Sequence, residues 1–267
     1  MKRETLPLWE TDIPCPVDGD KIPTITYYAS DCKNGKGTVV IFPGGGYHIL
    51  APHEGDGYAK FLNEHGYDAF VVTYRLNPIH FPAQLLDARR AVRFVRANAE
   101  KYGIDPNKIA VMGSSAGGHL AALVSTYRGA LEGEKDELDQ VDYLPNGTIL
   151  CYPVLNGTED GIRHLGSFIG LLGEDRLDQV AAFSPDLIAD EKTPPAFLWH
   201  TAEDKGVNVI NSYRYATRLR ELNIPAELHV FPFGPHGLGL CNEERRKQPY
   251  DAIWGDLLIR WLGLMGW

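Results

Sequence analysis

A serine on a tight, glycine-flanked turn offers the clearest chemistry in this sequence. The segment Gly113-Ser114-Ser115-Ala116-Gly117 follows the apolar run 109–112 and precedes a stretch of small, mostly apolar residues, 118–126. This order predicts a buried strand, a sharp turn and a helix. The residues two before and two after a serine on such a turn must be very small, and Gly113 and Gly117 satisfy this for Ser115. We therefore expect Ser115, and not Ser114, to be a nucleophile.

A serine hydroxyl needs a base to remove its proton, and nine histidines compete for this role. In folds with this serine turn, the acid and then the histidine follow the serine along the chain. His119 lies one helical turn past the serine, so we interpret it as structural. The others beyond the serine lie in an excursion or on strands: His164, His200 and His229. His236 alone follows the last expected strand, in a loop with glycine and proline neighbours that can present an imidazole. His236 is the predicted base.

The acid that orients this histidine is expected just beyond the preceding strand. Glu203 and Asp204 both occupy that position. Asp204 is favoured, because Val207 lies three residues later and its apolar side chain can anchor the loop. Glu203 remains an alternative, as does a plain turn with two solvated acids.

Backbone amides must stabilise the negative oxygen that develops on the reacting carbonyl. One amide is expected from Ala116, directly after the nucleophile. The others are assigned by analogy to Gly45 and Gly46, in the glycine-rich loop after the apolar run 38–42. Tyr47 and His48, next in this loop, are predicted to wall the acyl pocket.

The elements that must position these groups alternate along the chain. Strands are expected at 38–42, 69–74, 109–112, 148–152, 196–200 and 226–231, with helices between them at 54–65, 82–102, 118–126 and 209–222 and a last one at 250–262. Residues 1–37 suggest two edge strands, with a turn signal at Asn34-Gly35-Lys36-Gly37. The alternation predicts an α/β fold with a mainly parallel sheet covered on both faces. One domain over residues 1–267 is expected, with an excursion over the site at about 156–193.

Composition and charge exclude several classes of partner. The net charge is −9 and the calculated isoelectric point is about 5.5. Nucleic acid is not expected as a partner, and a small neutral substrate is favoured over an anion. No apolar run approaches the ~20 residues of a membrane helix, so no membrane partner is expected.

Four scattered cysteines, without metal-binding spacing, indicate a reducing cytoplasm. No metal or organic cofactor is implied, and a homo-oligomer stays open.

Several blocks resemble the α/β-hydrolase superfamily, in particular small bacterial esterase/lipase-like proteins close to hormone-sensitive-lipase-type esterases. The blocks are FPGGGY, AFVVTYRLN, LLDARRAVRFVRANAEKYGIDPNKIAVMGSSAGGHLAA, PPAFLWHTAED and ELHVFPFGPHGLGL. Some members of that group are described as acetylesterases or acetyl xylan esterases, and some carry a xylanase label. The resemblance implies a serine esterase for short acyl groups, including acetyl groups on sugars.

The sequence departs from this group at two positions. Pro43 replaces the histidine of the HGGG motif, and Asn208 follows Val207 where the acid loop often has proline. Two alternative functions follow from the same fold: a peptidase of the prolyl-oligopeptidase type, and a non-catalytic protein that binds a small ligand. The peptidase group usually carries a further large domain, and a non-catalytic protein would be expected to lack one of the three catalytic side chains.

Overall fold

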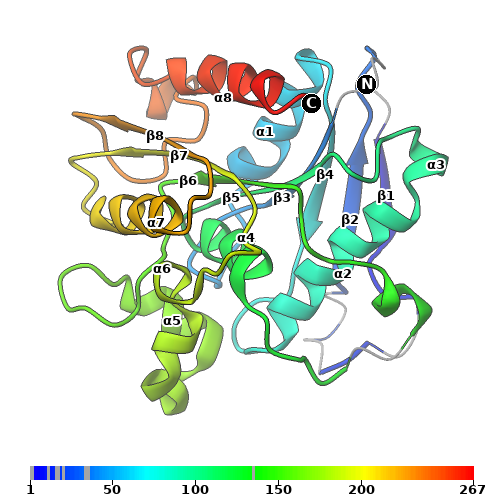
Figure 1. Ribbon diagram of the computed structural model, residues 1–267, viewed down its shortest axis with the longest axis horizontal. Helices are drawn as coiled ribbons and strands as arrows, with labels where there is room; N and C mark the ends of the chain where they lie inside the picture. Colours follow the sequence, from blue (N-terminus) through cyan, green and yellow to red (C-terminus); the bar gives the residue numbers. More distant parts are fainter. Residues whose placement is uncertain (1–2, 11–12, 16–18, 20–21, 33–36, 134–135) are drawn as a thin grey trace.

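An eight-stranded sheet organises the computed structural model, which describes residues 3–10, 13–15, 19, 22–32, 37–133 and 136–267 (Figure 1). The spatial order is β1-β2-β4-β3-β5-β6-β7-β8. The strands span β1 Arg3–Pro7, β2 Thr24–Tyr28, β3 Thr38–Phe42, β4 Asp68–Thr73, β5 Ile109–Ser114, β6 Gly147–Cys151, β7 Ala196–Thr201 and β8 Ala226–Phe231. The pairs β1/β2 and β2/β4 are antiparallel and the five other pairs are parallel. The expected mainly parallel sheet is confirmed.

Helices cover both faces of this sheet. Helices α1 and α8 pack on one face, whereas α2, α4 and α7 pack on the other (Figure 1). The α-helices span α1 Pro52–Glu64, α2 Ala83–Ala97, α3 Ala99–Tyr102, α4 Ser115–Thr126, α5 Leu165–Leu172, α6 Pro185–Ile188, α7 Ile210–Glu221 and α8 Ile253–Leu264; the 3-10 helices span η1 Glu137–Gln140, η2 Glu174–Phe183 and η3 Glu244–Arg246. Within the described residues, no helix combines the length and the apolar character needed to span a membrane.

Each central strand contributes side chains to two separate cores. In β3, Val40 and Phe42 pack towards α2 and α4, whereas Val39 and Ile41 pack towards α1 and α8. All five residues of β3 are buried, which explains its continuous apolar sequence. On the α1/α8 face, Trp199 of β7 stacks on Trp254 of α8 with ring centroids 4.8 Å apart. This contact fixes the strand from which the acid loop leaves.

The structure corrects two details of the expected elements. The helix expected over 82–102 is interrupted at Asn98, which separates α2 from α3 with non-helical backbone angles. Strand β2 is not at an edge, because it pairs with β4 as well as with β1. Only β1 of this pair is an edge strand, and Pro7 at its end is compatible with that position. The turn expected at Asn34-Gly35-Lys36-Gly37 lies largely outside the described residues.

The segment 156–193 leaves the sheet after β6 and carries α5, η2 and α6 before the chain returns to β7 (Figure 1). Its apolar side chains Phe168, Leu171 and Leu172 are buried and join the core on the α4 side. His119 of α4 connects this segment to the loop after β3, because its Nε2 donates to Phe183 O (2.7 Å) and its Nδ1 lies 3.0 Å from the Tyr47 hydroxyl. The interpretation of His119 as structural agrees with these contacts.

Candidate active site

The backbone around Ser115 is strained as a tight strand-to-helix turn requires. Ser115 follows β5 and begins α4 with φ +53°, a conformation that is uncommon for non-glycine residues. A Cβ on Gly113 would lie 2.1 Å from Gly117 O, and a Cβ on Gly117 would lie 2.1 Å from Phe42 O. Glycine is therefore required at both positions. Ser114 differs from Ser115, because it is fully buried and its Oγ lies 2.8 Å from the Tyr58 hydroxyl.

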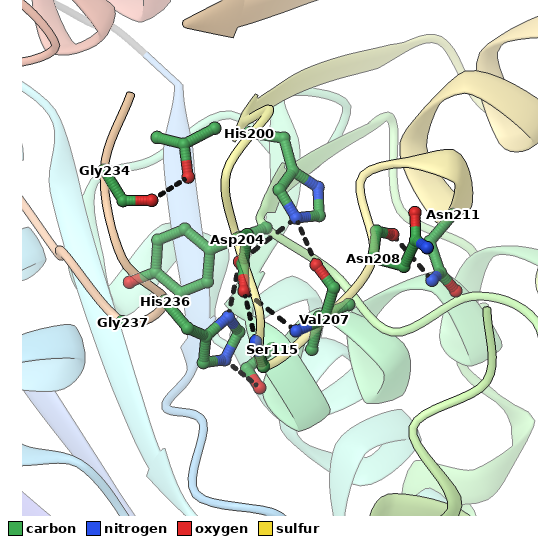
Figure 2. Close-up of polar contacts among 12 residues, drawn as sticks. Ser115, His200, Asp204, Val207, Asn208, Asn211, Gly234, His236 and Gly237 are labelled. Carbon is green, nitrogen blue, oxygen red and sulfur yellow. Dashed lines mark hydrogen bonds and ion pairs between the residues drawn. The ribbon is translucent and has the colours of Figure 1, made fainter. Parts of the chain in front are cut away.

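His236 reaches the serine from the loop after β8. Its Nε2 lies 2.8 Å from Ser115 Oγ, so the neutral imidazole can accept the hydroxyl proton (Figure 2). Gly206, in the acid loop, packs against the imidazole: a Cβ at this position would lie 2.9 Å from His236 Cβ. Glycine therefore lets the two loops approach closely enough to join acid and base.

Asp204 orients this histidine from the loop after β7. Its Oδ2 accepts a hydrogen bond from His236 Nδ1 at 2.7 Å, and its Oδ1 accepts from the backbone N–H groups of Gly206 and Val207 (Figure 2). Val207 is buried in the core, as an anchor of this loop should be. Glu203 is exposed on the surface, whereas Asp204 is 8% exposed. The structure thus brings Asp204, and not Glu203, to the histidine.

A second imidazole contacts the same carboxylate. His200, at the end of β7, is fully buried, and its Nε2 lies 3.2 Å from Asp204 Oδ2 and 3.0 Å from Val207 O. A carbonyl oxygen can only accept, so Nε2 carries the proton and Nδ1 accepts from Ser212 Oγ at 2.8 Å. Burial raises the pKa of Asp204, but the hydrogen bonds from His200 and His236 outweigh it and lower this pKa well below the ordinary value. Asp204 is therefore held ionised.

The three residues assigned to the oxyanion hole lie around the serine. Gly45 and Gly46 line a cavity of about 310 Å³ together with Ser115 and His236. Gly45 has φ +134°, and a Cβ on it would lie 2.2 Å from Ile49 O, so only glycine fits. Ala116 is the second residue of α4, and N–H groups in the first turn of a helix have no intrahelical acceptor. Gly45 and Gly46 thus share a cavity with Ser115, and Ala116 directly follows it.

A buried carboxylate holds the loop in which Pro43 replaces the expected histidine. Glu54, in the first turn of α1, is 3% exposed and accepts a hydrogen bond from Gly44 N at 2.8 Å. Its other oxygen accepts from the Tyr152 hydroxyl at 2.7 Å. The same hydroxyl accepts from Gly239 N, in the loop that carries the base, at 2.9 Å. Glu54 and Tyr152 therefore connect the glycine loop to the histidine loop.

Acyl transfer through a serine requires a nucleophile, a base, an orienting acid and amides for an oxyanion, and this arrangement contains residues of the types that can fill these roles. Among the described residues, no group of three or more histidine, cysteine, aspartate or glutamate side chains is arranged to hold a metal ion.

Comparison with known families places this fold in a described family. Residues 26–219, well over half of the chain, match the family described as BD-FAE. The chain belongs to the BD-FAE family.

Relatives of this BD-FAE chain include named esterases and a named xylanase. It is 37% identical over 229 residues to endo-1,4-beta-xylanase B of Butyrivibrio fibrisolvens, covering 84% of this chain and 36% of that protein. It is 31% identical over 214 residues to acetylxylan esterase of Xylanibacter ruminicola, covering 78% of this chain and 42% of that protein. The chain thus spans well under half the length of these two curated relatives.

A solved structure resembles the BD-FAE chain over nearly its full length. An acetyl ester-xyloside bifunctional hydrolase from Caldicellulosiruptor lactoaceticus superposes with a TM-score of 0.90 and 40% identity, covering 98% of this chain and 96% of that one. Together with the eight-stranded sheet, this similarity confirms the expected α/β-hydrolase fold.

The structure does not bring Tyr47 and His48 into the cavity that Ser115 lines. Tyr47 is fully buried, and its hydroxyl contacts His119 behind the glycine loop. His48 is exposed and lines a second cavity of about 230 Å³, with Arg75 and Ile79. Neither is among the described residues that line the Ser115 cavity. The tight turn at Gly45 and Gly46 explains this placement, because it reverses the chain and directs Tyr47 into the core. The predicted role of the two residues in the acyl pocket stays a prediction.

Sequence reasoning missed three residues of this BD-FAE site: Glu54, His164 and His200. His200 was excluded as the base because it ends a strand. Its position four residues before the acid was nevertheless a usable signal. His164 was set aside with the excursion, yet it lines the Ser115 cavity. Glu54 carried no signal beyond its place near the start of an expected helix.

Asn208 stands where proline often follows the valine of the acid loop. Its side chain is hydrogen bonded to the backbone N–H of Ile210, and its Nδ2 donates to Gly161 O of the excursion at 2.9 Å.

Proposed function

We propose that this chain is a serine carboxylesterase that removes short acyl groups, with acetylated sugars as its natural substrates. The observation that carries this proposal is the continuous hydrogen-bonded chain from Asp204 through His236 to Ser115, with contacts of 2.7 and 2.8 Å. The names of the relatives, an acetylxylan esterase and an acetyl ester-xyloside hydrolase, support the sugar ester as the substrate class.

The proposed reaction proceeds through an acyl-enzyme. Ser115 Oγ attacks the ester carbonyl while its proton moves to His236 Nε2. Asp204, held ionised, stabilises the imidazolium that forms. The amides of Gly45, Gly46 and Ala116 bind the negative oxygen. The same Nε2 proton then passes to the departing alcohol, and a water molecule, activated in turn by His236, releases the acid.

The size of the site supports small acyl groups. The Ser115 cavity of about 310 Å³ lies at the lower end of the ~300–1,000 Å³ common for ligand pockets. His164 contributes to its wall, so the excursion at 156–193 reaches the site. The proposal also includes one domain over residues 1–267, a small neutral ester as the substrate, no nucleic-acid or membrane partner, and a reducing cytoplasmic location. All four cysteines are free thiols, which supports the last of these. A homo-oligomer stays open.

Steady-state kinetics test this proposal. We expect the wild-type chain to hydrolyse p-nitrophenyl acetate faster than the octanoate, and to release acetate from acetylated xylo-oligosaccharides. Ser115→Ala should reduce turnover by about 10⁴- to 10⁶-fold on all of these esters. The matched variant Ser114→Ala, one residue earlier, should retain the sensitivity of the wild type to acyl length. Near-normal turnover in Ser115→Ala would exclude the proposed mechanism.

A further inference from the structure

His164 lies in the reaction cavity but has no part in the proposed mechanism. It belongs to the segment 156–193, far from the three catalytic positions in the sequence. It nevertheless lines the same cavity of about 310 Å³ as Ser115, His236 and Gly46. Its ring is partly buried there, so one edge of the imidazole is available to a bound ester.

The contacts of His164 with α5 determine which of its nitrogens carries the proton. His164 is the N-cap of this helix, and its Nδ1 accepts from the backbone N–H of Ser167 at 3.3 Å. Ser167 Oγ lies 2.8 Å from the same nitrogen. Because a backbone N–H can only donate, Nδ1 holds a lone pair and the neutral ring carries its proton on Nε2.

The Nε2–H group is therefore a donor without a partner in its own helix. Among the residues that the structure describes, none is hydrogen bonded to His164 Nε2. Burial, and next the charge of neighbouring His236, lower the pKa of His164. The ring thus stays neutral, and it offers a hydrogen bond but no charge to the ligand. A neutral N–H group can donate to the uncharged hydroxyl oxygen of an alcohol, which needs no opposite charge beside it.

The position of His164 indicates which half of the ester it meets. His236 delivers its Nε2 proton to the oxygen of the departing alcohol, so the alcohol must leave beside that imidazole. His164 is close enough to His236 and Asp204 for their charges to affect it. The alcohol half of the ester is thus the half that passes nearest to His164.

We propose that His164 Nε2–H binds a hydroxyl oxygen next to the ester on the departing alcohol, and so selects esters of sugars and other polyols. This inference rests on the proposed esterase activity. A pyranose acetylated on one carbon carries free hydroxyls on the neighbouring carbons, whereas p-nitrophenol has no hydroxyl beside its ester oxygen. His164 should therefore stabilise the transition state for a sugar ester and contribute nothing for an aryl ester.

Replacing His164 with asparagine separates this role from capping of α5. Asparagine is among the best N-cap residues, so His164→Asn keeps an acceptor for Ser167 N–H, while its shorter side chain places no N–H group at the position of the imidazole Nε2. We expect kcat/KM on acetylated xylo-oligosaccharides to fall about 10-fold, with p-nitrophenyl acetate changing by no more than about twofold. His65→Asn, at the C-terminal end of α1, is the matched control and should leave both values unchanged.

The deciding quantity is kcat/KM on acetylated xylo-oligosaccharides divided by kcat/KM on p-nitrophenyl acetate. If His164→Asn leaves the ratio as in the wild type, whether both substrates are unaffected or both decline together, the inference is wrong although the esterase proposal stands. If the wild-type chain hydrolyses neither ester, the proposed function itself fails and this inference fails with it. If the ratio falls in His164→Asn and also in His164→Phe, while kcat/KM on the aryl ester stays as in the wild type, the result supports a donor role for His164.

Discussion

His200 Nε2 lies 3.2 Å from Asp204 Oδ2, on the oxygen that also accepts the hydrogen bond from His236. Two imidazoles therefore converge on one buried carboxylate oxygen. His200 is fully buried and is not among the described residues that line the Ser115 cavity, so it acts through Asp204 as a positioning residue. Its own orientation is fixed by Val207 O and Ser212 Oγ.

Replacement of His200 by phenylalanine should lower kcat about 10-fold or more and leave KM unchanged. The reason is the loss of a hydrogen bond to an ionised group, which is worth about 1.5–3 kcal/mol. Active-site titration with a fluorophosphonate gives the fraction of folded, competent chains. If kcat per titrated site equals the wild-type value, His200 has only a structural role. His229→Phe, on the neighbouring strand β8, is the control.

Asp204→Asn should reduce kcat by roughly 10³- to 10⁴-fold. An amide in this position no longer stabilises the imidazolium and can hold the ring in the wrong tautomer. Glu203→Gln provides the matched control, because this acid precedes Asp204 but is exposed. Its kcat/KM should stay within about twofold of the wild type. Comparable losses in the two variants would contradict the assignment of the acid.

Glu54→Gln should lower kcat by about 10-fold and the free energy of unfolding by about 1–3 kcal/mol. The carboxylate accepts from Gly44 N and from the Tyr152 hydroxyl, and an amide has only one acceptor oxygen to offer. Glu64→Gln, at the exposed end of the same helix, is the control. Urea unfolding and p-nitrophenyl acetate kinetics measure the two effects. Equal behaviour of both variants would show that Glu54 does not hold the glycine loop.

The free energy of unfolding should fall as the pH decreases from about 6.5 to about 4, because of His119. Burial lowers the pKa of His119 from 6.5 to about 4 in the folded chain. Between these values the unfolded chain binds a proton that the folded chain does not, so stability increases with pH in this window. The contribution is about 3 kcal/mol, fully present above pH 6.5. Urea unfolding as a function of pH measures it, and a chain with His119→Gln should show a shallower slope. An equal slope in both chains would show that His119 is not the source of this pH dependence.

The sequence predicted that Ser115, Asp204 and His236 would meet, and this prediction started from a strained turn that needs particular residues. Gly113 and Gly117 are required by contacts of about 2 Å with backbone oxygens, so their spacing alone identified Ser115. The positions of Asp204 and His236 followed from strand order, since parallel strands end at one edge of the sheet. The roles of all three in catalysis remain predictions for experiment.

The sequence was less informative where tertiary contacts decide the outcome. The turn at Gly45 and Gly46 directs Tyr47 into the core, and no local pattern reports the positive φ of 65° at that tyrosine. Glu54 pairs with Tyr152, 98 positions away, and His164 enters the cavity through a segment that has no fixed place in the alternation of strands and helices. Such contacts depend on packing between distant segments, which periodicity cannot reveal.

Mapping the site of fluorophosphonate labelling tests the central claim most directly. After reaction of the intact chain, digestion and mass spectrometry should place the modification on Ser115 and leave neighbouring Ser114 unmodified. Labelling should be absent in Ser115→Ala, unchanged in Ser114→Ala and strongly slowed in His236→Ala. Modification of a different serine, or labelling that persists in Ser115→Ala, would contradict the account.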